Sequence, residues 1–257
     1  MALLTQEAID SVRIVVPQDI RRAAEALHAI ADRCGMRAAP AHDIAGKRTP
    51  TDADGSLLAS EVFGWADSDR VWWRNSRIAL NSPLTCACRF ESMPFWVNAE
   101  GFRTAQPNRY LESIDLTNFE ARAMTRAAIV VPVHLPFGQI GAVSFNPLDS
   151  HKLDLAVDFA ACGDAFGIYA RTFITGYVHA MGSLQALPGA SRLSKREVEC
   201  LRWAAIGKTD REIAMIMERS HATVRFHIHN ASMKLDAVNR SQTLFKAAQL
   251  GYISLVG

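Results

Sequence analysis

Helix start signals in the last quarter of the chain constrain its fold more than any other feature. Ser194 lies three residues before Glu197, and Thr209 lies three residues before Glu212. Each pair is a capping box, in which side chains bind the free backbone N–H groups of a helix's first turn. Ser220 supplies a third N-cap soon after the apolar stripe of the second helix ends. Two helices joined by so short a turn are typical of a helix-turn-helix.

The third of these helices begins at His221 and has two distinct faces. At about 100° per residue, its apolar residues gather in an arc that must face the domain core: Val224, Ile228, Ala231 and Leu235. The opposite arc carries Ala222, Arg225, Phe226, His229 and Met233. Arginine in a major groove reads guanine, and an apolar side chain contacts the thymine methyl group. We therefore predict that Arg225 reads guanine, Phe226 contacts thymine and His229 donates to a base or a phosphate.

The formal net charge of +2 hides an asymmetry between two parts of the chain. From Gly189 onward, eleven lysines and arginines face six aspartates and glutamates, a net charge of +5. The preceding part has 17 basic and 20 acidic residues, a net charge of −3. A basic segment attached to a larger acidic one favours a nucleic-acid partner for the basic segment.

A metal site and a simple packing module are the alternatives for this segment. His227 and His229 are two residues apart on the helix and point in different directions, whereas a helical metal-binding pair needs a spacing of three or four. We therefore expect no metal here, and we expect His227 to pack toward the core. A packing module without nucleic acid explains the caps and the core but leaves the outer arc without a purpose.

Residues 192–253 resemble the DNA-binding domain of LuxR-type transcription regulators. The matching residues are Glu197, Leu201, Gly207-Lys208-Thr209, Glu212-Ile213-Ala214, Thr223-Val224, His227, Lys234-Leu235 and Asn239-Arg240. The resemblance implies a fourth helix, from about residue 239 to residue 250, that pairs two copies across a two-fold axis. It also implies base contacts from the positions held here by Arg225, Phe226 and His229, and phosphate contacts from Lys208, Thr209, Ser220 and Thr223. Ala222, on the same face, is also predicted to contact DNA.

The part of the chain before residue 183 mixes helical and strand patterns. Apolar residues recur at helical spacing over residues 20–33, with Asp19 as the expected N-cap. Residues 127–134 and 139–146 are apolar, β-branched runs joined by a short turn, which predicts a β-hairpin. Pro132 inside the first run predicts an edge position or a bulge.

A long helix is expected from about residue 152 to residue 181, because large apolar side chains recur along it. Helices that flank a largely antiparallel sheet form an α/β/α sandwich. We therefore predict an α+β protein. It has an N-terminal α/β/α sandwich sensory domain in residues 1–182, a linker in residues 183–191, and an all-α, four-helix helix-turn-helix domain in residues 192–257.

Aromatic residues crowd into the stretch from residue 63 to residue 102. They are Trp65, Trp72, Trp73, Trp96, Phe63, Phe90, Phe95 and Phe102. Such a cluster either fills a core or lines a closed pocket for a small organic ligand, since aromatic rings supply large contact areas. Both interpretations remain open at this point.

No catalytic or metal-binding pattern competes with these interpretations. The sequence contains no nucleophile elbow, P-loop or HExxH motif. Cys86 and Cys88 lack a second pair, and the five cysteines are scattered, which favours reduced thiols over a disulfide framework. We therefore expect no enzyme activity, no metal and no cofactor.

The N-terminal part also resembles the autoinducer-binding domain of quorum-sensing members of the LuxR family. The similar segments are RAAIVVPVHLPFGQIGAVSF, Asn81-Ser82-Pro83 and Pro94-Phe95-Trp96. The resemblance implies a ligand-binding set of Asp69, Trp72, Trp73, Ser82, Phe95, Trp96 and Ser144. Ser82 replaces the aspartate that binds the ligand amide in the family, and Asp69 replaces a tryptophan that binds the lactone carbonyl. A hydroxyl in place of a carboxylate removes a charged acceptor and fits a different head group.

These patterns predict a transcription regulator that binds double-stranded DNA as a homodimer and responds to a small hydrophobic ligand. The ligand is an acyl-homoserine lactone or a different small molecule. Apolar runs such as residues 127–133 are far shorter than the roughly 20 residues of a membrane span, and the N-terminus lacks a signal-peptide pattern, so a cytoplasmic location is expected. The alternatives are a ligand-independent regulator whose aromatics fill its own pocket, an enzyme domain fused to a DNA-binding tail, and an interaction scaffold.

Overall fold

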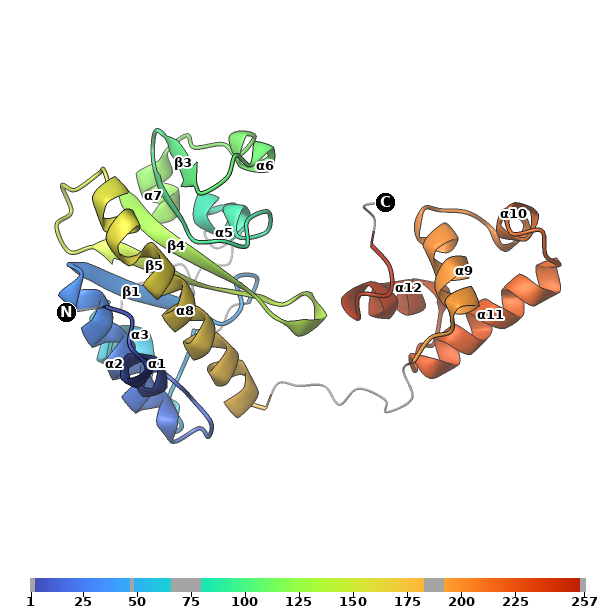
Figure 1. Ribbon diagram of the computed structural model, residues 1–257, viewed down its shortest axis with the longest axis horizontal. Coiled ribbons are helices and arrows are strands. Elements are labelled where there is room, and N and C mark those ends of the chain that lie inside the picture. The colour runs from blue at the N-terminus through green and yellow to red at the C-terminus, as the bar shows by residue number, and fades with distance from the viewer. Residues whose placement is uncertain (1–2, 47–48, 66–79, 183–191, 255–257) are drawn as a thin grey trace. The chain divides into compact units, whose positions relative to one another are not determined.

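The computed structural model describes residues 3–46, 49–65, 80–182 and 192–254, and the chain divides into two compact units (Figure 1). Unit 1 holds residues 1–135 and 139–184, and unit 2 consists chiefly of residues 185–257. The elements before residue 184 are α1 (Gln6–Ser11), α2 (Asp19–Arg33), β1 (Met36–Ala41), α3 (Leu58–Glu61), α5 (Pro83–Ala87), β2 (Phe95–Asn98), β3 (Gly101–Thr104), α6 (Arg109–Glu112), α7 (Phe119–Ala123), β4 (Ala127–His134), a 3-10 turn (Pro136–Gly138), β5 (Ile140–Pro147) and α8 (Ala156–Ala180).

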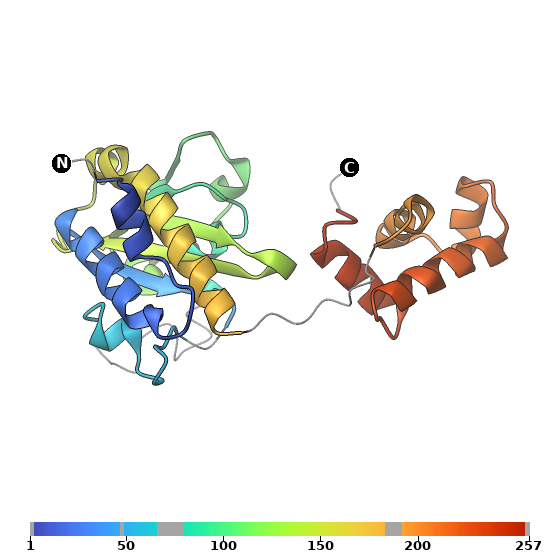
Figure 2. The same ribbon diagram turned by 60° about the horizontal axis from the view of Figure 1, so that its bottom comes forward.

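A five-stranded sheet in the order β1-β5-β4-β2-β3 forms the centre of unit 1, and every neighbouring pair is antiparallel. Helices α1, α2 and α8 cover one face, and α5 and α7 cover the other (Figures 1 and 2). Because both faces are covered, β4 is apolar and buried from Ala127 to Val133, and its last residue, His134, is exposed. This arrangement confirms the predicted α/β/α sandwich.

The face covered by α2 and α8 holds the larger core. The rings of Phe145 on β5 and Phe166 on α8 stack with their centroids 3.9 Å apart. The apolar stripe predicted for α2 is buried, including Ile20 and Leu27. Helix α8 lies so close to β5 that a Cβ on Gly141 would come within 2.6 Å of the Ile174 side chain. Close packing of this kind makes the helical layer sensitive to small changes in side-chain volume.

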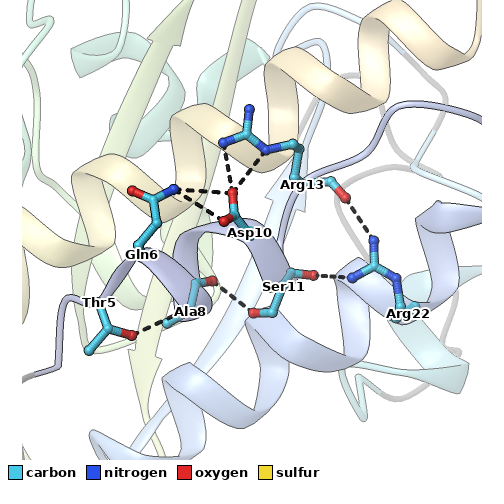
Figure 3. A network of polar contacts seen from close by, with 7 residues as sticks. All are labelled: Thr5, Gln6, Ala8, Asp10, Ser11, Arg13 and Arg22. Carbon is cyan, nitrogen blue, oxygen red and sulfur yellow. Dashed lines mark hydrogen bonds and ion pairs between the residues drawn. The ribbon is translucent and has the colours of Figure 1, made fainter.

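Helix α1 is attached to α2 by backbone-directed hydrogen bonds (Figure 3). The Thr5 hydroxyl accepts from the Ala8 N–H at 3.2 Å and caps the start of α1. The Arg22 guanidinium of α2 donates to the carbonyl oxygens of Ser11 (2.8 Å) and Arg13 (3.0 Å) just after α1. These carbonyl groups at the helix C-terminus have no intrahelical donor, so Arg22 satisfies them and joins the two helices.

The predicted cap of α2 is wrong in one detail. Asp19 is the first residue of the helix, and Gln18 occupies the N-cap position without a side-chain hydrogen bond. The Asp19 carboxylate reaches backward and accepts the N–H groups of Val15 (3.0 Å) and Val16 (3.1 Å). It therefore orders the preceding turn and keeps its negative charge near the positive end of the helix.

The predicted hairpin is confirmed, and Pro132 occupies a locally unpaired side of β4. Strand β4 lies inside the sheet, but β2 pairs with it only as far as Val130. Pro132 pairs with Ala142 of β5 on one side and has passed the end of β2 on the other. A missing N–H is tolerated there, because the neighbouring strand has already ended. Helix α8 is also a few residues shorter than predicted, beginning at Ala156.

Unit 2 is all-helical, as predicted, with α9 (Lys195–Ala205), α10 (Asp210–Ile216), α11 (His221–Lys234) and α12 (Arg240–Gln249). Both predicted capping boxes are present, at the starts of α9 and α10. Ser220 caps α11, and Asn239 caps α12. Along the described residues of both units, no helix is long and apolar enough to cross a bilayer.

Candidate functional site

The outer face of α11 is exposed, and its inner face is buried, as the helical geometry predicts. Val224, Ile228 and Ala231 are at most 8% exposed and pack against the other helices of unit 2. The residues on the outer arc are all exposed: Ala222, Arg225, Phe226, His229 and Met233. His227 is half-buried between the two faces, with its ring edge toward Phe226 at 5.8 Å. The polar and apolar groups of the outer arc therefore project together from one rigid helix.

Two of the exposed outer side chains are large and apolar. Phe226 is 60% exposed and Met233 is 68% exposed. In this position the two side chains add little to the stability of unit 2, because apolar area that stays in water contributes no burial energy. A partner that covers the helix would bury them, and exposed apolar groups on a polar face are typical of interaction sites.

The cations of this surface are largely without acidic partners. In the stretch 192–254, no carboxylate lies within ion-pair distance of Arg225, Arg219 or Arg211. Lys208 is 3.6 Å from the Glu212 carboxylate, a long and solvent-exposed pair. Weak pairs of this kind are screened by water and contribute little stability, so these cations are available to a phosphate.

The start of α11 lies beside a basic hollow. The hollow is lined by Ala204, Gly207, Lys208, Thr209, Asp210, Arg211, His221 and Arg240. Arg240 is held in place by an ion pair with Asp210 and by donation to the Lys208 carbonyl oxygen at 2.8 Å. The N–H groups in the first turn of α11 add the positive end of the helix dipole. A phosphate group is the ligand that such an arrangement favours.

The capping hydroxyls predicted as phosphate contacts are already engaged within the protein. Ser220 Oγ accepts the Thr223 N–H at 3.1 Å, and the two hydroxyl oxygens are 2.8 Å apart. Thr209 Oγ1 donates to the Glu212 carboxylate at 2.8 Å. These residues fix the positions of the helix starts. One proton of the Ser220–Thr223 hydroxyl pair is left to donate to a phosphate, whereas the Thr209 proton is taken by Glu212.

A buried ion pair sets the position of α11 against α9. Glu197 is 3% exposed, and both of its carboxylate oxygens accept from Lys234 Nζ at 2.9 Å. Burial opposes ionisation of Glu197, but hydrogen bonds from Lys234 and from the Ser194 N–H outweigh it and lower the pKa of Glu197. The pair joins the first turn of α9 to the last turn of α11, so it orients the outer arc.

A pocket lies in unit 1 on the face of the sheet that α5 and α7 cover. Its lining is Ala39, Ala41, Ile44, Trp65, Ser82, Leu84, Thr85, Cys88, Arg122, Ala123, Met124, Val130, Ala142, Ser144 and Asn146. The sheet forms the floor of the pocket. Space is left above it because paired positions of β1 and β5 carry small side chains, with Ala39 opposite Ser144 and Ala41 opposite Ala142. Larger residues form the walls. Mostly apolar lining with a few polar groups is typical of small-molecule sites.

Polar groups of the pocket are positioned by hydrogen bonds. The Ser144 hydroxyl donates to Asn146 Oδ1 at 3.3 Å, and the Thr85 hydroxyl donates to the Ser82 carbonyl oxygen at 3.0 Å. The Trp65 indole N–H donates to the Ala38 carbonyl oxygen at 2.7 Å, which holds the ring at the pocket wall. Because each hydroxyl already donates its proton, its lone pairs can accept from a hydroxyl or an N–H group of a ligand.

Arg122 of α7 lines the pocket. Its Nη1 donates to Asp115 Oδ2 at 2.8 Å, and its Nε donates to the Asn81 carbonyl oxygen at 3.0 Å. Backbone and side-chain hydrogen bonds from Thr117, together with Arg122, lower the pKa of Asp115. Arg122 therefore joins α7 to the chain just before Ser82. No local sequence pattern distinguishes Arg122 from any other surface arginine.

The predicted ligand-binding residues are divided by the structure. Ser82 and Ser144 both line the pocket. Phe95 is fully buried in the core cluster on that side of the sheet without lining the pocket. Trp96 is wrongly placed by the prediction, because successive residues of a strand point to opposite faces. It packs in the core under α2 and α8, with the Arg103 guanidinium 5.7 Å from its ring.

Three further predicted residues, Asp69, Trp72 and Trp73, lie outside the described residues.

Comparison with known proteins connects the helical unit to a family. Residues 191–247 match the family described as bacterial regulatory proteins, luxR family. Unit 2 is a luxR-family domain. The match begins before α9 and ends within α12, so it includes the whole of the exposed helix α11.

Curated relatives match parts of this chain. The quorum sensing-dependent transcriptional regulator RpaR of Rhodopseudomonas palustris is 49% identical over 144 residues, which are 52% of this chain and 54% of RpaR. The transcriptional activator protein VanR of Vibrio anguillarum is 37% identical over 135 residues, 50% of this chain and 52% of VanR. The chain spans about half the length of these curated relatives.

Solved structures similar to this chain include Escherichia coli SdiA. Its crystal structure is 21% identical, covers 89% of this chain and 91% of SdiA, and has a TM-score of 0.46. The structure of SdiA in complex with octanoyl-rac-glycerol is 19% identical, covers 95% of this chain and 92% of that chain, and has a TM-score of 0.47.

Proposed function

We propose that this chain is a transcription regulator that binds double-stranded DNA through α11 and is controlled by a small hydrophobic ligand in the pocket of unit 1. The observation that carries the proposal is the outer arc of α11. There Arg225, Phe226 and His229 are exposed on a helix that is capped by Ser220 and buried on its opposite face, in a luxR-family domain. The names of RpaR and VanR describe a transcriptional regulator and a transcriptional activator, which supports the same role for this chain.

The residues of α11 and its first turn would make different kinds of contact with DNA. Arg225 presents two donors to guanine, Phe226 buries its ring against a thymine methyl, and His229 donates to a base or a phosphate. Lys208 and the first turn of α11 bind the backbone and set the register. In this proposal residues 1–182 bind the ligand, residues 192–257 bind DNA, and residues 183–191 are the linker between these two domains. The protein acts as a homodimer in the cytoplasm and catalyses no reaction.

Control by a ligand follows from linkage between two binding events. A ligand shifts DNA affinity only by the difference between its affinities for the two arrangements of the protein. The pocket of unit 1, lined by Ala39 and Ser144, supports control by a ligand over the alternative of a regulator whose own aromatic side chains fill the pocket. Of the predicted aromatics, Trp96 lies on the other face of the sheet and fills no part of it.

DNA recognition is tested by an arginine substitution with a matched control. A preferred duplex is selected from random double-stranded DNA with the full chain, and its affinity is measured for Arg225→Ala and Arg196→Ala. Arg225→Ala should weaken the preferred duplex about 5- to 150-fold and relax one base position, since a bidentate contact contributes about 1–3 kcal/mol. Arg196→Ala is the matched control, because Arg196 is exposed on α9 and its substitution removes the same positive charge. Equal small losses in both variants would remove α11 from the recognition surface.

Ligand control is tested by filling the pocket. The full chain is heated with a panel of acyl-homoserine lactones and aromatic acids, since a ligand that binds only the folded state raises Tm. Ala39→Leu puts a larger side chain on the pocket floor and should abolish the shift. Ala161→Leu makes the same change at an exposed site of α8 and should retain it. A cooperative melt with no shift for any compound would favour the ligand-independent alternative.

A further inference from the structure

Two cysteines from distant parts of the sequence are in contact on the helical side of unit 1. Cys34 follows the last turn of α2, and Cys162 lies in the second turn of α8. They are 128 positions apart, and their sulfur atoms are 3.2 Å apart. Both are free thiols and half-buried at the edge of the core. A small oxidant can therefore reach them.

The backbone holds this pair in place. The N–H groups of Cys34 and Gly35 donate to the carbonyl oxygens of Ala31 (2.9 Å) and Asp32 (2.8 Å), which closes the end of α2. Gly35 has a φ of +68°, a left-handed value that turns the chain into β1 without strain. A disulfide needs a sulfur–sulfur distance of about 2.05 Å, so each sulfur must move by only about 0.6 Å. A small side-chain rotation provides this movement.

We propose that Cys34 and Cys162 are a redox-modification site that forms a reversible intramolecular disulfide on exposure to a peroxide. The proposal is independent of the proposed ligand and of DNA binding, since it depends only on the contact between α2 and α8. It assigns a function to two residues that neither the pocket nor the α11 surface uses.

The reaction balances with hydrogen peroxide as the oxidant. One cysteine loses its thiol proton and its thiolate attacks a peroxide oxygen. The O–O bond breaks, and the leaving hydroxide takes up that proton, so a sulfenic acid and one water form. The thiol of the other cysteine attacks the sulfenic sulfur, the S–O bond breaks, and the second water leaves with the released proton. Two thiols lose two electrons in total, and one peroxide is reduced to two waters.

Reactivity of the pair depends on proximity more than on thiolate content. Burial, followed by the neighbouring Cys162 thiol, raises the pKa of Cys34 to about 12. Little of Cys34 is ionised at neutral pH, so reaction within the pair depends on the 3.2 Å contact between the two sulfur atoms. Once the first sulfur is oxidised, the second is already in contact with it. The overall rate should rise with pH, because either attack requires loss of a thiol proton.

The disulfide would join the end of α2 to α8 by a covalent bond. Strand β1 begins at Met36, directly after Gly35, and its residues Ala39 and Ala41 form part of the pocket floor. Oxidation would thus restrain the point at which the helical layer enters the sheet. Cross-linking positions so far apart also restricts the unfolded chain, which should raise the Tm of unit 1 by about 5–15 °C.

The experiment treats the folded full chain with hydrogen peroxide, blocks remaining thiols with N-ethylmaleimide and maps peptides by mass spectrometry without reduction. We expect a cross-linked peptide containing Cys34 and Cys162, lighter by two hydrogen atoms, that disappears on treatment with dithiothreitol. It should form faster at pH 9 than at pH 7 and should be accompanied by the rise in Tm. Cys34→Ser and Cys162→Ser should lose both effects, and Cys86→Ser should retain them.

Three outcomes would overturn the proposal. The first is N-ethylmaleimide on both Cys34 and Cys162 after oxidation of a protein that remains folded. The second is a disulfide between two chains or to another cysteine. The third is sulfinic acid at one of the two positions with the other still alkylated. Circular dichroism of the reduced variants, including Cys34→Ala, separates loss of the cross-link from loss of the fold.

Discussion

The buried carboxylate of Glu197 provides the sharpest test of how α11 is positioned. Substitution with glutamine retains the size of the side chain and one acceptor oxygen but removes the negative charge. In the folded protein that charge accepts two hydrogen bonds from Lys234 at 2.9 Å and one from the Ser194 N–H at 2.7 Å. Glu197→Gln therefore leaves Lys234 without its counter-ion while the shape of the helix start is retained.

The magnitude follows from burial of the pair. The Glu197 side chain is 4% exposed and that of Lys234 is 37% exposed, so one partner is desolvated and the other is partly hydrated. Removing one partner of a buried pair costs about 3–5 kcal/mol, and charge-assisted hydrogen bonds contribute about 1.5–3 kcal/mol. Because Lys234 retains access to water, we expect a loss of about 2–4 kcal/mol in the free energy of unfolding of unit 2 at pH 7.

Native-state hydrogen exchange on the full chain measures this loss for unit 2 alone. Peptides from α9 and α11 should exchange about 30- to 1,000-fold faster in Glu197→Gln, since each 1.4 kcal/mol is a factor of ten. Glu199→Gln is the matched control, because Glu199 lies on the same helix and forms an exposed pair with Arg196 at 2.7 Å. That variant should change the free energy by less than about 1 kcal/mol.

The pH dependence adds a second test. The folded state lowers the pKa of Glu197, so ionisation stabilises the fold. This contribution is complete above the ordinary pKa of 4.5 and is lost as the pH falls through the lowered folded value. The difference between the original protein and Glu197→Gln should therefore shrink in acid. Equal exchange for Glu197→Gln and Glu199→Gln at pH 7, or a difference that persists in acid, would refute the reasoning.

Three other substitutions test separate parts of the structure. Lys208→Ala should weaken binding to all duplexes alike and lower the slope of log affinity against log salt by about 0.9, the value for one phosphate contact; a sequence-selective loss would contradict this role. Trp96→Ala should destabilise unit 1 by about 3–5 kcal/mol in urea denaturation, since the ring fills the core, and a cost below about 1 kcal/mol would be inconsistent with that position. Gly141→Ala should cost about 1–3 kcal/mol by forcing Ile174 and the Ala41 carbonyl oxygen away from the new methyl group, and an unchanged urea midpoint would argue against this close approach.

The helices of unit 2 were predictable almost residue by residue. Ser194, Thr209 and Ser220 mark helix starts because each cap hydroxyl binds an N–H only three residues later. The two faces of α11 follow from the helical repeat, so burial of Val224 and exposure of Arg225 needed no knowledge of the partner helices. Information of this kind is local, and a local pattern is fully contained in the sequence.

The hairpin of unit 1 was also predictable, but its surroundings were not. Apolar, β-branched runs on either side of a short turn identify β4 and β5. Period-two alternation places Phe95 and Trp96 on opposite faces of β2. It does not say which face α8 covers, and for this reason Trp96 was predicted for the pocket but packs in the helical core.

The sequence by itself determined the four capped helices, the outer arc of α11, the β4–β5 hairpin and the mixture of helices with an antiparallel sheet. The tertiary structure alone decided which small side chains form the pocket floor, that Arg122 lines the pocket, and that Cys34 contacts Cys162. Caps and helix faces depend on residues three or four positions apart, whose geometry is set by the backbone repeat. The pairing of Ala39 with Ser144 joins residues more than a hundred positions apart. Contacts of that range form only when the whole unit packs, because each depends on the combined burial of many side chains from both layers.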